Sequence, residues 1–154
     1  MVTIQIQNDA PGVRTEASKL RALIHAICKR FGISRATISV GIVDDGRMRE
    51  LNEKHLHHKR NTDSLSFDLS DEAEAGQPRV LDLIVNGELA AREAAGRGHS
   101  AQAELALYVA HGLLHQLGFD DATAKQARRM HQTEDEILQH LGYGIVYNTQ
   151  ARTK

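Results

Sequence analysis

The chain has 154 residues, a formal net charge of −1 and a single cysteine. This length suits one domain with one hydrophobic core. The near-zero charge excludes a protein that attracts nucleic acid with its whole surface. No apolar run approaches the roughly 18 residues of a membrane-spanning helix, and Cys28 has no partner for an internal disulfide. With no secretory signal at the start, these features favour the cytoplasm.

Apolar residues follow strand spacing in some segments and helix spacing in others. Strands are expected at 2–7, 36–45, 62–70 and 79–89, and helices at 15–32, 46–57, 87–98, 100–118 and 121–142. Thr15 and Ser100 are expected to cap two of these helices, and Gly32 and Gly118 to end them. No repeat or linker divides the chain. We therefore expect a single α+β domain over residues 1–154, with a small mixed sheet of about four strands, helices packed on it, and a peripheral tail from about residue 143.

The most informative stretch is HGLLHQLGFDD, residues 111–121. His111 and His115 are four residues apart on a predicted helix, so both lie on one face and can bind a single zinc ion. Gly118 follows where the helix can end, and Asp121 comes ten residues after His111. This spacing matches the metzincin pattern H-E-x-x-H-x-x-G-x-x-H, with glycine in place of glutamate and aspartate in place of the third histidine.

The two changes differ in their chemical consequence. A carboxylate is an accepted zinc ligand, so His111, His115 and Asp121 still form a three-ligand set with a fourth position open for water. Gly112 stands where metalloproteases carry their general base, and glycine cannot move a proton. The sequence identifies no other base, and this argues against an ordinary protease.

A purely structural interpretation stays open for the same residues. The helix is apolar nearly all round, and two buried neutral histidines can simply be hydrogen-bonded. Asp121 can instead cap the next helix. Asp120 is the nearest competing ligand, and His131 and His140 are remote ones.

Three further groups of residues have both a functional and a structural interpretation. Glu104 lies seven residues before His111 and is either an acid that orients a histidine or a salt-bridged helix residue. Lys59 and Arg60 close a basic stretch, 53–60, that is either a phosphate-binding patch or a solvated helix end. Asp63 and Ser66, with Thr62, either line a cleft near the metal or satisfy turns and strand edges.

The chain resembles the YbeY family of zinc-dependent endoribonucleases that mature ribosomal RNA. The family signature H-G-x-L-H-x-x-G-[YF]-D-H stands here as HGLLHQLGFDD, so Gly112 is a family feature. Further likeness lies in TDSLSF (62–67), LDLIVNGELAAREA (81–94) and MHQTEDEILQHLG (130–142).

The resemblance implies an α+β fold with one Zn²⁺ in a cleft, held by His111, His115 and Asp121. It implies single-strand-specific cleavage of RNA, in maturation of the 3′ end of small-subunit ribosomal RNA and in ribosome quality control. Implied partners are ribosomal RNA and ribosome-assembly factors, with no membrane. Lys59 and Arg60 are the candidate RNA-binding residues.

The sequence departs from the family at two positions. Asp121 replaces the usual third histidine, and Leu56 stands where the family usually has an arginine thought to matter for activity. Two rival functions remain: a ribosome-associated binding protein with a structural zinc, and a metal-dependent hydrolase of another substrate, such as a peptide.

Overall fold

The computed structural model describes residues 1–56, 63–70 and 77–144; for residues 55 and 56 it describes the backbone alone. The elements in chain order are β1 (Val2–Asn8), α1 (Ala17–Arg30), β2 (Ala36–Val43), α2 (Asp45–Leu56), β3 (Ser64–Asp68), β4 (Arg79–Asn86), α3 (Gly87–Arg97), α4 (Ala101–Gln116) and α5 (Ala124–His140). All nine expected strands and helices are present, with shifted ends.

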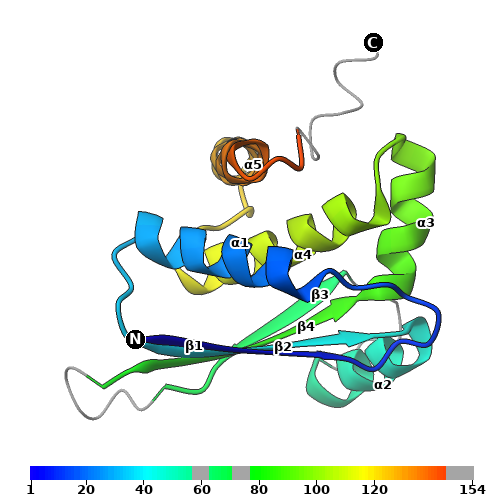
Figure 1. Ribbon diagram of the computed structural model, residues 1–154, viewed down its shortest axis with the longest axis horizontal. Helices are drawn as coiled ribbons and strands as arrows, with labels where there is room; N and C mark the ends of the chain where they lie inside the picture. The colour runs from blue at the N-terminus through cyan, green and yellow to red at the C-terminus, as the bar shows by residue number, and fades with distance from the viewer. Residues whose placement is uncertain (57–62, 71–76, 145–154) are drawn as a thin grey trace.

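The four strands form one mixed sheet in the order β1-β2-β4-β3. β1, β2 and β4 run parallel, and β3 pairs antiparallel with β4 at the edge. Figure 1 shows α1 and α4 lying across one face of this sheet, with α5 stacked on them and α2 beneath the opposite face. The predicted α+β fold with a small mixed sheet is confirmed.

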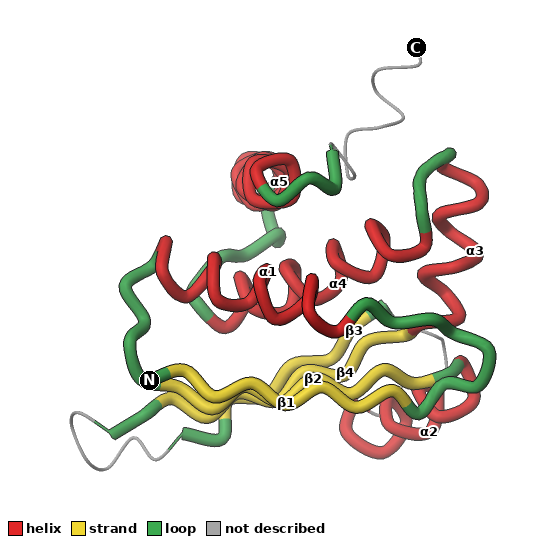
Figure 2. The backbone as a smooth tube through the Cα atoms, in the orientation of Figure 1, coloured by secondary structure: helices red, strands yellow, loops and turns green. Residues whose placement is uncertain are grey.

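The main core lies between the sheet and the two helices that cover it. Alternate strand residues point into it, as the period of two in a strand requires. Helix α4 is buried along almost its whole length, because the sheet covers one side and α1, α3 and α5 cover the others (Figure 2). This placement explains why α4 is apolar nearly all round. None of the described helices is long and apolar enough to cross a membrane.

Several predicted boundaries are corrected by local hydrogen bonds. The predicted cap Thr15 is wrong: the first helix begins after Glu16, and the Thr15 hydroxyl accepts a hydrogen bond from Asn8 instead. The strand expected to reach residue 45 ends at Val43, because Asp45 opens α2. The strand expected to reach residue 89 ends at Asn86, whose side chain caps α3.

The other predicted helix ends are confirmed. Ser100 accepts a hydrogen bond from the backbone of Ala103 and caps α4. Gly32 and Gly118 follow α1 and α4 with positive φ angles of 71° and 101°, which glycine adopts without strain. The predicted burial of Cys28 is also confirmed, and this burial raises the pKa of its thiol.

Candidate metal centre

Two histidines project from the last two turns of α4. The rings of His111 and His115 are edge-to-face with their centroids 4.6 Å apart, as expected for residues one helical turn apart. Their side chains are 19% and 33% exposed, so both stay reachable from solvent at the end of a buried helix. The pair therefore forms the wall of an accessible site.

The turn after α4 brings Asp121 back over the two histidines. Its Oδ2 lies 3.9 Å from Nε2 of His111 and 3.9 Å from Nε2 of His115. Ligand atoms on a tetrahedral ion with bonds of about 2.0–2.2 Å lie about 3.4 Å apart. The observed separations are slightly wider, and Asp121 is 43% exposed, which leaves its carboxylate room to move inward. The three side chains fit one metal ion.

A backbone carbonyl fixes the hydrogen placement on His115. Nδ1 of His115 lies 3.1 Å from the carbonyl oxygen of Phe119. A carbonyl only accepts, so Nδ1 carries the hydrogen and donates it. In the neutral ring this leaves a lone pair on Nε2, the atom that faces Asp121.

The buried carboxylate of Glu134 does the same for His111. Nδ1 of His111 lies 2.8 Å from Oε2 of Glu134, and Nδ1 of His131 lies 2.7 Å from Oε1 of the same carboxylate. Glu134 comes from α5 and is 0% exposed. Both histidines donate from Nδ1, so Nε2 of neutral His111 also presents a lone pair towards Asp121.

A second set of potential ligand atoms exists in His111, His131 and Glu134. Their N···O separations of 2.7–2.8 Å are hydrogen-bond distances. Two ligand atoms on one ion would need about 3.4 Å. The geometry therefore favours a supporting hydrogen-bond network here and a metal at His111, His115 and Asp121.

The surrounding charges favour a cation. Burial alone lowers the pKa of His111, but the hydrogen bond to Glu134 and the charges of Glu134, Asp63 and Asp121 outweigh it and raise the pKa above its usual value. The negative potential that raises this pKa also attracts a metal ion.

The structure explains why glycine follows the first histidine. A Cβ placed on Gly112 would lie 3.1 Å from Cδ2 of Leu83, a fully buried residue of β4. Residue 112 thus faces the sheet, and a longer side chain would enter the core. Glycine lets α4 approach β3 and β4 closely, and a glutamate base has no room at this position.

Other predicted residues fall outside the centre. Glu104 forms an ion pair with Arg97 and a hydrogen bond with His99, so the salt-bridged alternative holds for it. Asp120 accepts a hydrogen bond from the backbone N–H of Asp121. His140 lines a separate hollow between α1 and α5.

The alternative in which Asp121 caps the next helix is wrong. Thr123 caps α5, in a capping box with Gln126. This leaves the Asp121 carboxylate available to the histidines.

Of the polar residues predicted beside β3, the structure describes Asp63 and Ser66. Ser66 accepts a hydrogen bond from Gln116, and the Asp63 carbonyl accepts one from the backbone of Asn86. These bonds match the alternative in which they satisfy strand edges. Lys59, Arg60 and Thr62 lie outside the described residues, as does the side chain of Leu56.

Sequence reasoning missed Glu134 and undervalued His131. Both stand in the stretch MHQTEDEILQHLG, three residues apart and therefore on one helix face. A buried acid on the inner face of a strongly amphipathic helix was the available signal. Only the packing of α5 on α4 shows that this acid reaches His111.

The fold and the site define an α+β protein with a histidine–carboxylate cluster suited to a metal ion. The model of the family Endoribonuclease YbeY matches residues 4–142. A relative named Endoribonuclease YbeY from Anaeromyxobacter sp. (strain Fw109-5) is 36% identical over 92% of this chain and 73% of its own length. One of the same name from Shouchella clausii (strain KSM-K16) is 32% identical over 94% of this chain and 98% of its own. The chain belongs to the YbeY endoribonuclease family.

A solved structure has the same fold. The solution structure of TM1509 from Thermotoga maritima covers 98% of this chain and 93% of its own, with a TM-score of 0.61 and 21% identity. At this identity the likeness concerns the fold alone.

Proposed function

We propose that this protein is a metal-dependent endoribonuclease whose single metal ion is held by His111, His115 and Asp121. The observation that carries the proposal is the convergence of Nε2 of both histidines on Oδ2 of Asp121, at 3.9 Å each. Family membership supplies the reaction class, because the relatives are named endoribonucleases.

The chain's own residues prepare the site for a cation. Glu134 and the Phe119 carbonyl hold the two imidazoles by Nδ1 and direct their free Nε2 atoms towards Asp121. A metal ion bound there would supply Lewis-acid chemistry at a phosphodiester, polarising a phosphate oxygen or lowering the pKa of water. The partly exposed His115 and Asp121 leave the site open to a polymeric substrate.

The finer features of the proposal come from the family resemblance. They are zinc as the ion, single-stranded RNA as the substrate, maturation of the 3′ end of small-subunit ribosomal RNA, and ribosome quality control in the cytoplasm. Ribosomal RNA and ribosome-assembly factors are the proposed partners. The ligand set supports zinc on chemical grounds, because two imidazoles and one carboxylate are a known catalytic set for that ion.

One observation favours a second function, a ribosome-associated binding protein with a structural metal. Leu56 stands where the family usually carries an arginine, and leucine cannot neutralise a phosphate. This rival predicts bound metal and RNA binding without cleavage.

The test combines metal content and cleavage. Protein purified without added metal is analysed by plasma mass spectrometry, and the same samples are incubated with single-stranded RNA. We expect about one zinc per wild-type chain, with loss of both metal and cleavage in His115→Ala and Asp121→Ala. Metal without cleavage in the wild type would favour the structural rival. Cleavage that survives in metal-free His115→Ala would refute the metal mechanism.

A further inference from the structure

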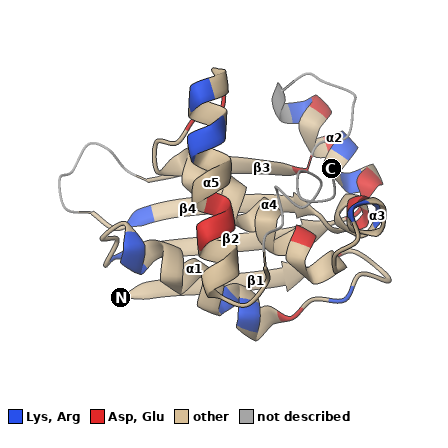
Figure 3. Cartoon of the chain, turned by 90° about the horizontal axis from the view of Figure 1, so that it is seen from above, with Lys and Arg blue, Asp and Glu red and all other residues tan. Residues whose placement is uncertain are grey.

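Helix α5 separates its basic residues from its acidic residues along the chain. Its N-terminal half holds Lys125, Arg128 and Arg129, and its later half holds Glu134, Asp135 and Glu136. The first turn contains no acid. The helix dipole favours acids over cations in the first turn of a helix, so Lys125 is unfavourably placed for stability. Figure 3 shows the separate basic and acidic bands along α5.

The three cations also lie together and without carboxylate partners. Their spacing of three and four residues places them on one face, where like charges repel. All three are exposed, and none forms an ion pair within the described residues. Five other arginines, by contrast, are ion-paired: Arg30, Arg47, Arg79, Arg92 and Arg97. The α5 cations are therefore free to bind an anion.

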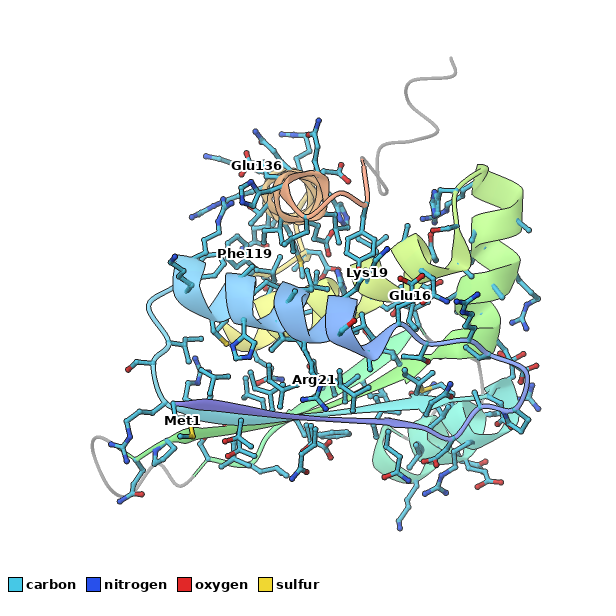
Figure 4. All side chains as sticks on the ribbon, viewed as in Figure 1. Met1, Glu16, Lys19, Arg21, Phe119 and Glu136 are labelled. Carbon is cyan, nitrogen blue, oxygen red and sulfur yellow. The ribbon has the colours of Figure 1, made fainter. Side chains whose placement is uncertain are left out.

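This basic face borders the candidate metal centre. Arg129 lies over the ring of Phe119, with its guanidinium carbon 5.5 Å from the ring centroid. Phe119 is the residue whose carbonyl orients His115, and it lies between α1 and α5 (Figure 4). Arg129, Gln126, Asp120 and Phe119 line a hollow of about 220 Å³ beside the turn that carries Asp121.

We infer that Lys125, Arg128 and Arg129 form a surface that binds the phosphate backbone of the single-stranded RNA as it enters the metal centre. The inference rests on the proposed function for its substrate. Exposed, unpaired cations suit a flexible polyanion, because lysine and arginine contacts with phosphates release counterions and supply affinity independent of base sequence.

The test measures binding apart from cleavage. A fluorescein-labelled single-stranded RNA is titrated with wild type, with Lys125→Ala/Arg128→Ala, and with the matched control Arg14→Ala/Arg49→Ala, which removes two other exposed cations. We expect the α5 variant to bind on the order of tenfold more weakly at low salt. We also expect the slope of log K against log salt to fall by about 0.7 for each lost contact. The control should bind like the wild type.

Metal content and a denaturing gel on the same samples separate the two proposals. Equal affinity and equal salt slope for the α5 variant and the wild type would overturn the surface, whatever the cleavage result. If the wild type cleaves no RNA but the α5 variant binds RNA more weakly than the wild type, the RNA-binding surface is supported and the proposed nuclease activity is refuted. An equal loss in the control would show general charge attraction and would also overturn the assignment. Arg129→Gln, tested separately, should weaken binding without loss of metal.

Discussion

Two glutamate–histidine clusters lie at the two ends of helix α4, and they differ in which side chains surround the buried carboxylate. Near its start, Glu104 is 1% exposed and contacts both His99 and the guanidinium of Arg97. Near its end, Glu134 of α5 is 0% exposed and contacts only imidazoles, those of His111 and His131, in the bonds resolved for it. Both carboxylates are buried, but among the described residues only Glu104 has an arginine beside it.

The arginine beside Glu104 makes its cluster structural, whereas the cluster around Glu134 is suited to bind a cation. An arginine is always charged and neutralises Glu104 permanently. Neutral imidazoles donate hydrogen bonds to Glu134 but leave its charge in place, and Asp63 and Asp121 add to the negative potential at His111. A buried negative charge that is only hydrogen-bonded favours a cation nearby. Substitutions at each cluster can test this contrast.

The largest expected effect is on the arginine cluster. Glu104→Ala removes the partner of Arg97 and His99, and breaking such a buried pair costs about 3–5 kcal/mol. We expect the low end of that range, because Arg97 is partly exposed. Urea denaturation measures the loss, and metal content per folded chain should stay unchanged. A loss of metal in this variant would show that the Glu104 cluster also supports the metal centre, and would contradict its purely structural role.

The second prediction concerns the imidazole cluster. Glu134→Gln keeps the shape but removes the charge, and loss of such a supporting partner typically lowers metal affinity 10–100-fold. This corresponds to about 1.4–2.7 kcal/mol of binding free energy. Competition with a chromophoric chelator measures the affinity. Glu104→Gln is the matched control, and an equal fall in both variants would contradict a specific role for Glu134.

The third prediction tests the close approach of α4 to the sheet. Gly112→Ala places a methyl group 3.1 Å from Leu83, which is fully buried. Overpacking costs about 1–3 kcal/mol, and the better helix propensity of alanine returns about 0.5–1 kcal/mol. We expect a net destabilisation of about 1 kcal/mol in thermal or urea unfolding. A higher stability of Gly112→Ala than of the wild type would show that Leu83 can move away and that a side chain fits at position 112.

These residues show where sequence reasoning succeeds and where it stops. The closeness of His111, His115 and Asp121 was predictable from spacing, because four residues make one helical turn and a glycine marks where the chain turns back; their role as metal ligands stays a prediction. The four strands were predictable from alternation, since one face of each is buried. Their ends were not. β4 ends at Asn86, because its side chain caps α3 and also donates a hydrogen bond to Asp45 at the start of α2.

The contacts that distinguish the two glutamates were beyond the sequence. Glu104 and Glu134 both follow apolar helical patterns, and nothing local says which one meets an arginine. Glu134 reaches His111 only through the packing of α5 on α4, over 23 residues of sequence. Thr15 failed as a predicted cap for a similar reason, because the side chain of Asn8 engages its hydroxyl.

The smallest expected effect compares two helix caps, one beside each cluster. Ser100 caps α4 near Glu104, and Thr123 caps α5 two residues after Asp121. Ser100→Ala and Thr123→Ala should each cost about 1 kcal/mol of stability, the usual value of a lost cap. Only Thr123→Ala should also weaken metal binding, because the capping box with Gln126 fixes the turn that presents Asp121. Chelator competition on both variants makes the comparison. Equal affinities would mean that Asp121 is placed by the Gly118 turn alone, and that the α5 cap serves only the helix.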